Sequence, residues 1–412
     1  MENLESIERM YKESLKKLDE YKNLDLNMAR GKPNKLQLDL SNPLLDLITS
    51  KTNFNRGVDL RNYGILDGID EAKILFGNLI GVSKDEIMIL GNSSLNIMYD
   101  TLQRAMQFGV CGNEPFNKQG KIKWICPAPG YDRHFAITEH FGIEMITVNM
   151  TESGPDMDKV EELVTDPQVK GIWCVPKFSN PQGIVYSDEV VTRFAKLKPA
   201  AKDFRIYWDN AYCTHFIYED VNLLNLLDEA KKYNNEDICY MFGSTSKITF
   251  PGSGVSWVSA SKNNLNDIKK HMQFQTIGFN KINQLAHVEF LKDVDGIKTH
   301  MKKHAEILKP HFDIVLEVLE KNLSNLCSWT KPLGGYFISI DLPNNTAKRA
   351  VALAKEHGVI MTGAGATYPY KLDPNDSNIR IAPTLPSEEE LKTAMEVFCL
   401  CVKVAYCETV LK

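Results

Sequence analysis

Short apolar segments alternate with helical patterns along most of the chain, and this alternation constrains the fold more than any other feature. Apolar runs such as 86–90, 123–126 and 205–209 are only a few residues long, and helix-spaced segments lie between them. Apolar strands separated by helices are typical of a mostly parallel sheet whose two faces are covered by helices. We therefore predict an α/β fold.

The pattern changes near residue 295, where a long helical zone begins and later strands no longer follow the same alternation. The last helix is expected from Ser387, because Glu390 lies three residues later and the two form a capping-box signature. We predict a large domain over residues 55–295 and a smaller α+β domain over residues 296–412. The N-terminal segment 1–54 is expected to pack with the small domain.

Composition excludes several classes of protein. The 412 residues are 43% hydrophobic and 25% charged, as in globular proteins, and the net charge is -5. A mildly acidic chain has no general attraction for nucleic acid or for an anionic membrane. No apolar run approaches the roughly 20 residues of a membrane helix. The nine cysteines form no C-x-x-C pair, and the N-terminus lacks the apolar core of a signal peptide. We expect a cytoplasmic protein with reduced cysteines.

Polar or aromatic residues follow several predicted strands. In open α/β sheets, ligands bind at this carboxyl edge. Gly91-Asn92-Ser93-Ser94 opens a helix and could hold a phosphate, although an ordinary helix cap has the same pattern. Tyr131 could face a planar ligand or lie in the core, and Asn180 could belong to a simple turn. Asp209 ends an apolar strand and needs a partner there, because an unpaired buried charge is costly.

The order of these motifs resembles one known family. The elements are the helix start at Asn92, Tyr131, Asn180-Pro181, Asp209-x-x-Tyr212, Ser244-x-x-Lys247 and Arg380. Together they are similar to the pyridoxal-phosphate-dependent aminotransferases of the aspartate aminotransferase superfamily, which have the type I fold. The resemblance covers nearly the whole chain. The runs 30–33, 62–68 and 91–95 are closest to a divergent bacterial branch of aspartate aminotransferases.

The resemblance implies catalytic roles for several of these residues. Lys247 would form the internal Schiff base with the cofactor, pyridoxal 5′-phosphate, and would later move the proton at the substrate Cα. Asp209 would pair with the pyridinium nitrogen and keep the ring an electron sink. Asn180 and Tyr212 would hydrogen-bond the phenolic oxygen of the ring, and Tyr131 would stack on it.

The cofactor phosphate has its own expected contacts. The resemblance assigns it to Asn92, Ser93, Ser94 and Ser244, and to Tyr63 of a neighbouring subunit. It therefore implies an obligate homodimer with shared active sites. Members of the family usually clamp the phosphate with an arginine shortly after the lysine, whereas this chain has Gly254 at that place.

Two further positions concern the substrate. The resemblance implies that Arg380 binds the α-carboxylate as a bidentate fork and that Gly31 closes over it. No motif identifies the residue for a side-chain carboxylate. Arg133 and Arg30 are the candidates, and either could instead be structural.

We therefore expect a ping-pong aminotransferase that acts on small-molecule amino acids and 2-oxo acids, most simply aspartate and 2-oxoglutarate. The alternatives are an aminotransferase for alanine or aromatic amino acids, a β-lyase or decarboxylase, and a regulatory protein that only binds the cofactor. No metal site is expected. His300 and His304 have metal-ligand spacing, but their lysine-rich flanks favour a solvated helix face.

Overall fold

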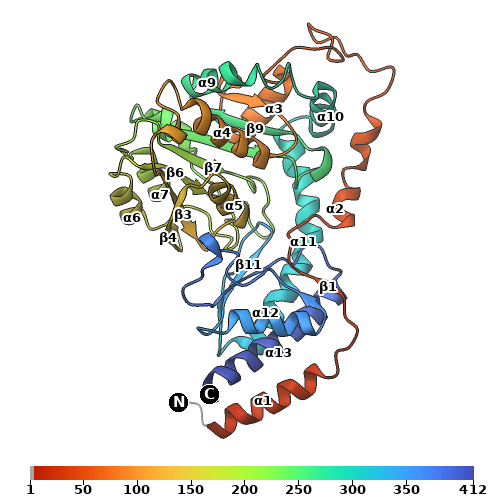
Figure 1. Ribbon diagram of the computed structural model, residues 1–412. Helices are drawn as coiled ribbons and strands as arrows, with labels where there is room; N and C mark the ends of the chain where they lie inside the picture. The colour runs from red at the N-terminus through yellow and green to blue at the C-terminus, as the bar shows by residue number, and fades with distance from the viewer. Residues whose placement is uncertain (1–3) are drawn as a thin grey trace.

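The computed structural model describes residues 4–412, which form two lobes (Figure 1). The larger lobe contains an eight-stranded sheet in the order β2-β9-β8-β7-β6-β3-β4-β5. The strands from β8 to β4 run parallel, as predicted, whereas β2–β9, β9–β8 and β4–β5 are antiparallel pairs. The bounds are β2 Ile87–Ile89, β3 Lys123–Ala128, β4 Glu144–Thr151, β5 Gly154–Pro155, β6 Val169–Cys174, β7 Arg205–Asp209, β8 Cys239–Ser244 and β9 Ser256–Ala260.

Both faces of this sheet are buried, and alternate side chains of a strand enter different cores. Trp208 packs in a core with α3, α6, α7 and α8, whereas its neighbour Tyr207 packs in a core with α4, α5 and α9. Two-sided burial explains why the strands are almost continuously apolar in sequence. The helices are α3 Asp70–Ile80, α4 Ser94–Phe108, α5 Asp132–His140, α6 Met157–Leu163, α7 Asp188–Ala195, α8 Leu226–Lys231 and α9 Lys262–Met272.

The smaller lobe is built on a three-stranded antiparallel sheet in the order β10-β11-β13. Helix α1 lies against α13, so both ends of the chain meet at the bottom of this lobe (Figure 1). The predicted capping box of α13 is confirmed, since Ser387 and Glu390 each bond the backbone N–H of the other. The elements are α1 Leu4–Leu18, β10 Ser328–Trp329, β11 Ile338–Asp341, α12 Ala347–Glu356, β13 Asn378–Ile381 and α13 Glu388–Val410.

Two connections tie the lobes together. The N-terminal strand β1 (Leu26–Asn27) pairs with β12 (Val359–Ile360) of the small lobe, and α2 (Lys35–Asp39) follows it. After α10 (Lys281–Leu291), helix α11 (Val294–Leu323) runs from one lobe to the other (Figure 1). Among residues 4–412, no helix has the length and apolar character needed to span a bilayer.

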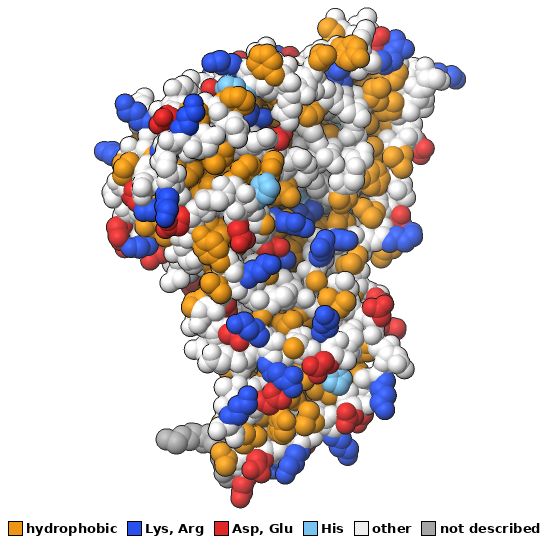
Figure 2. Space-filling model, viewed as in Figure 1, with side chains coloured by type: hydrophobic (Ala, Val, Ile, Leu, Met, Phe, Trp, Pro, Cys, Tyr) orange, Lys and Arg blue, Asp and Glu red, His pale blue; other side chains and the backbone are white. Residues whose placement is uncertain are grey.

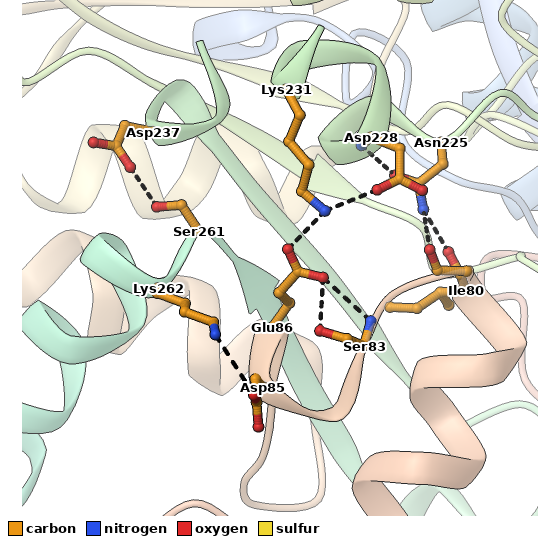
Figure 3. Close-up of polar contacts among 11 residues, drawn as sticks. Ile80, Ser83, Asp85, Glu86, Asn225, Asp228, Lys231, Asp237, Ser261 and Lys262 are labelled. Carbon is orange, nitrogen blue, oxygen red and sulfur yellow. Dashed lines mark hydrogen bonds and ion pairs between the residues drawn. The ribbon is translucent and has the colours of Figure 1, made fainter. Parts of the chain in front are cut away.

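Polar contacts connect the start of β2 to α8, and α8 to the end of α3 (Figure 3). The Glu86 carboxylate, just before β2, accepts hydrogen bonds from Ser83 and pairs with Lys231 of α8 at 2.6 Å. Asn225, the N-cap of α8, donates to the Ile80 carbonyl at 2.7 Å. These contacts hold an antiparallel edge strand whose end leads directly to the turn at Gly91.

Candidate functional site

The candidate site lies at the carboxyl edge of the large sheet. Asp209 ends β7, Ser244 ends β8, Asn180 follows β6 and Tyr131 follows β3. Gly91 follows β2, whose antiparallel neighbour β9 brings it to the same edge, and Ser256 donates to the Gly91 carbonyl at 2.7 Å. The parallel strands therefore gather residues that lie far apart in the sequence.

Asp209 is the most deeply buried charged side chain of the site, at 3% exposure. Its Oδ2 lies 3.0 Å from His134 Nε2, and the His134 ring stacks on Trp173 with centroids 4.5 Å apart. Its Oδ1 is buried and has no hydrogen-bond partner among the described residues. A buried carboxylate oxygen without a donor is costly, so the site fits a ligand that presents an N–H group to Asp209.

His134 is a residue whose role sequence reasoning missed. It lies on α5, three residues after Tyr131, and its contact with Asp209 spans 75 positions. Tyr131 packs edge-on against it with ring centroids 4.9 Å apart. Burial, followed by the nearby Asp209 charge, raises the pKa of Tyr131 to about 12, so its phenol stays neutral.

Lys247 faces two tyrosine rings. Its Nζ lies 5.0 Å from the Tyr212 ring centroid and 5.8 Å from that of Tyr336. Burial disfavours the ammonium form and lowers the pKa of Lys247, and the Asp209 carboxylate acts in the opposite direction. A lysine with a lowered pKa is a better nucleophile and proton acceptor near neutral pH. Burial also raises the pKa of Tyr212 well above its usual value.

Tyr336 carries no motif in the sequence, yet a buried network holds it beside Lys247. Gln37 of α2 donates to the Tyr336 hydroxyl at 3.0 Å and lies 3.1 Å from His304 Nδ1. His304 contacts His300, and His300 Nε2 lies 2.8 Å from the carbonyl of Ile248, the residue after Lys247. The expectation of a solvated histidine face is therefore wrong, because α11 packs this face against α2 and the lysine loop.

Small polar side chains surround the start of α4. Ser93 is the N-cap of α4 and makes no side-chain cap bond, and Ser94 is the first helical residue. Ser246 donates to the Asn92 carbonyl at 3.4 Å and accepts from Ser244 at 3.0 Å. Free N–H groups at a helix start, beside several hydroxyls, suit a phosphate.

Gly254 has a steric reason to lack a side chain. A Cβ there would lie 3.0 Å from the Asn92 carbonyl oxygen and 3.2 Å from Thr245 Oγ1. Asn283 bonds the Gly254 carbonyl at 3.1 Å and fixes this approach. The turn that carries Asn92 therefore leaves little room for a side chain at position 254.

Arg380 lies on β13 in the small lobe and points toward residues of the large lobe. Its Nη1 donates to Asp132 Oδ1 at 2.8 Å and to Asn180 Oδ1 at 3.2 Å. Its guanidinium carbon lies 4.7 Å from the Phe337 ring centroid. Gly31 packs against the same ring, since a Cβ at Gly31 would lie 2.6 Å from Phe337. Arg380 and Gly31, both predicted to bind the substrate α-carboxylate, therefore lie beside the same phenylalanine ring.

Three of the predicted residues, Tyr63, Arg133 and Arg30, are exposed to solvent. Tyr63 is 83% exposed on a loop, and its backbone N–H bonds Asn62. Arg133 and Arg30 are also exposed. Arg133 lies on the first turn of α5, next to Asp132, whereas Arg30 lies next to Gly31. Among residues 4–412, no cluster of three or more histidine, cysteine or acidic side chains could hold a metal ion.

Comparisons with known proteins identify the family of the chain. The chain matches the family described as aspartate amino-transferase over residues 2–412. It is 44% identical over 412 residues to an aspartate aminotransferase of Corynebacterium glutamicum, covering 98% of this chain and 95% of that protein.

Solved structures extend the likeness to three dimensions. The crystal structure of an aspartate transaminase from Corynebacterium glutamicum superposes with a TM-score of 0.96 at 44% identity, covering 98% of this chain and 97% of that one. An α-aminoadipate aminotransferase from Thermus thermophilus, solved with N-(5′-phosphopyridoxyl)-L-leucine, superposes with a TM-score of 0.76 at 19% identity. That match covers 96% of this chain and 95% of the other, and it speaks for the fold alone. This protein belongs to the aspartate amino-transferase family and has the type I fold of its aminotransferases.

Proposed function

We propose that this protein transfers the amino group of L-aspartate to 2-oxoglutarate with pyridoxal 5′-phosphate as cofactor. The observation that carries the proposal is the buried Oδ1 of Asp209, which has no hydrogen-bond partner in the described part of the chain and lies in the same site as Lys247. A ring nitrogen that carries a proton supplies the donor that this oxygen lacks. Membership of an aminotransferase family supports the same reading.

The residues present fit this cofactor along its whole length. Asp209 would hold the ring nitrogen, with His134 fixing the carboxylate from the other side, and Tyr131 would cover one face of the ring. Ser93, Ser94, Ser244 and the Asn92 backbone would hold the phosphate. When bound, the cofactor supplies an aldehyde that accepts the amino group and an aromatic ring that takes up the electron pair released at the substrate Cα.

The chain's own groups then do the remaining work. Lys247 Nζ would move the proton between the substrate Cα and C4′ of the cofactor, for which its lowered pKa prepares it. Tyr212 and Asn180 would bond the phenolic oxygen of the ring. Arg380 would bind the α-carboxylate, and Gly31 would close over it from the N-terminal segment.

Aspartate as the donor rests on two supports. The relative from Corynebacterium glutamicum, which shares 44% of its residues with this chain, is named an aspartate aminotransferase. Arg133 offers a positive charge one residue from Asp132, itself bonded to Arg380, and could bind the second carboxylate of aspartate or glutamate. Alanine or aromatic donors, and β-elimination, are the competing outcomes of the test below.

A homodimer is the second part of the proposal. Apolar side chains remain exposed on the large lobe, and Figure 2 shows such side chains along the right margin, over the segment between α2 and α3. The exposed apolar residues include Leu45, Val58 and Tyr63 before α3, and Phe274 and Ile277 after α9. Exposed apolar surface of this kind favours association. Tyr63 would then reach the phosphate bound by the partner subunit, which accounts for its exposure in one chain.

We also propose that residues 1–54 and 296–412 form one substrate-closing domain and that residues 55–295 form the cofactor domain. The pairing of β1 with β12 supports this division. A cytoplasmic location is part of the proposal, supported by the nine cysteines, all of which are free thiols in the described part of the chain.

The test has two arms. Purified protein reconstituted with the cofactor should absorb between about 330 and 430 nm, and borohydride reduction should attach the cofactor to the peptide containing Lys247. The variant Lys247→Ala should not be labelled. A panel of amino donors with 2-oxoglutarate should then give aspartate the highest kcat/KM. Absence of the absorbance band overturns the cofactor, and activity with alanine but not aspartate overturns the donor.

A further inference from the structure

The arginine proposed for the substrate already holds a carboxylate. Asp132 Oδ1 accepts a hydrogen bond from Arg380 Nη1 at 2.8 Å. We propose that Asp132 is a placeholder for the substrate α-carboxylate, and that every substrate must compete with it for Arg380. This inference rests on the proposed role of Arg380 and adds a residue that sets substrate affinity.

The two partners differ in how free they are to move. The Arg380 side chain is 7% exposed and is held between Phe337 and Asn180. The Asp132 side chain is 36% exposed and lies at the first position of α5. Asp132 can therefore turn toward solvent while Arg380 stays in place. At a helix start the carboxylate also remains stabilised by the helix dipole after it leaves Arg380.

Because both groups are negatively charged, Arg380 cannot bind Asp132 and the substrate α-carboxylate at full strength at the same time. One guanidinium balances one carboxylate in this partly buried site, and a second anion beside it would meet the charge of the first. Arg380 nevertheless has donor capacity to spare, since its Nε is buried and has no partner among residues 4–412. An α-carboxylate that displaces Asp132 can satisfy this donor as part of a bidentate fork.

The placeholder would have a use in the free enzyme. Arg380 is a buried cation at the junction of the lobes, and a buried charge without a partner is costly. Asp132 supplies that partner until substrate arrives. The same contact joins β13 of the small lobe to α5 of the large lobe, so exchanging one carboxylate for another need not leave Arg380 unpaired.

The variant Asp132→Asn tests the inference, because asparagine keeps the shape and the accepting oxygen but removes the charge. In the cofactor-loaded enzyme, succinate should bind about tenfold more tightly, measured by calorimetry. KM for aspartate should fall by a similar factor with kcat nearly unchanged. Asp132→Glu, which restores the charge, should keep succinate affinity close to that of the wild type.

The opposite result is equally informative. If Asp132 only orients Arg380, Asp132→Asn will weaken succinate binding and raise KM, and the placeholder is excluded. Equal effects of Asp132→Asn and Asp132→Glu would also exclude it, since charge would then play no part. Asp188→Asn makes the same change at the first residue of α7, and it should leave succinate affinity unchanged.

Arg380→Ala separates this inference from the proposed function. If Arg380→Ala leaves succinate binding intact, Arg380 is not the carboxylate site and the proposed function loses that residue. If Arg380→Ala weakens binding but Asp132→Asn does not strengthen it, only the placeholder fails. In the double variant, Asp132→Asn should no longer tighten binding, because the shared guanidinium is gone.

Discussion

The two ends of the site are built differently. The ring end, formed by Asp209, His134 and Tyr131, comes entirely from the large lobe, and its buried Asp209 Oδ1 has no hydrogen-bond partner among residues 4–412. The carboxylate end joins Arg380 of the small lobe to Asp132 and Asn180 of the large one. The ring end is therefore preformed by one core, whereas the carboxylate end depends on how the lobes sit against each other.

The largest expected effect concerns the ring end. Asp209→Ala should lower kcat about a thousandfold, because it removes the charge that would keep the ring nitrogen protonated in a buried site. Steady-state kinetics on the reconstituted enzyme measures this. Asp209→Asn keeps the shape without the charge and should lose almost as much. A variant that retains a tenth of wild-type kcat would mean that this end is not electrostatically preformed.

A smaller effect is expected at the carboxylate end. Arg380→Ala should lower kcat/KM for aspartate about a hundredfold, mostly through KM, since a buried charged contact to substrate is lost. Arg380→Lys should recover only part of the loss, because lysine cannot form a bidentate fork. An unchanged KM in Arg380→Ala would show that Arg380 does not bind the substrate. The proposed difference between the two ends of the site would then be wrong.

The smallest effect concerns the histidines behind the lysine loop. Burial, followed by the charge of neighbouring His300, lowers the pKa of His304 to about 3. Between about pH 3 and the ordinary histidine value near 6.5, the unfolded chain therefore binds more protons than the folded one, and stability falls as the pH falls. From pH 6.5 to pH 5, His304 should contribute a loss of about 2 kcal/mol.

Urea unfolding at several pH values measures this loss. His304→Gln should flatten the pH dependence of the free energy of unfolding below pH 6.5. His140→Gln, the same change at an exposed histidine, should leave the pH dependence of the free energy of unfolding unchanged. An equally steep dependence in His304→Gln would show that other groups carry it, and the network behind Lys247 would then be insensitive to protons.

Much of the fold was predictable from local pattern. Strands buried on both faces are recognisable in the sequence as short apolar runs, and the capping box at Ser387 is recognisable by its residue spacing. The same pattern predicted that the ring-end residues meet at one edge, because parallel strands place their carboxyl ends along one edge, whereas their roles were predicted from the family resemblance. Their spatial gathering is thus a consequence of sheet topology.

Partners from other elements could not be predicted in this way. His134, Asp132 and Tyr336 have ordinary neighbours in sequence, and their roles depend on contacts across 75 positions or more. The histidines of α11 were misread because lysines flank them in sequence. Those lysines occupy a different side of the helix from His300 and His304, which face α2. The helical periodicity of the sequence predicted α11, but only its tertiary packing identified which side of the helix is buried.

Helix α11 passes through Pro310 on its way between the lobes. Ile297 and Met301 belong to the core of the large lobe, whereas Phe312 and Val315 belong to that of the small lobe. Because proline has no N–H to donate, the carbonyl of Glu306 lacks its usual helical partner. Bending therefore costs least at the one turn that separates the two cores. If the small lobe moves relative to the large lobe, α11 is expected to bend at this turn. The half of α11 that contacts the lysine loop would then stay in place.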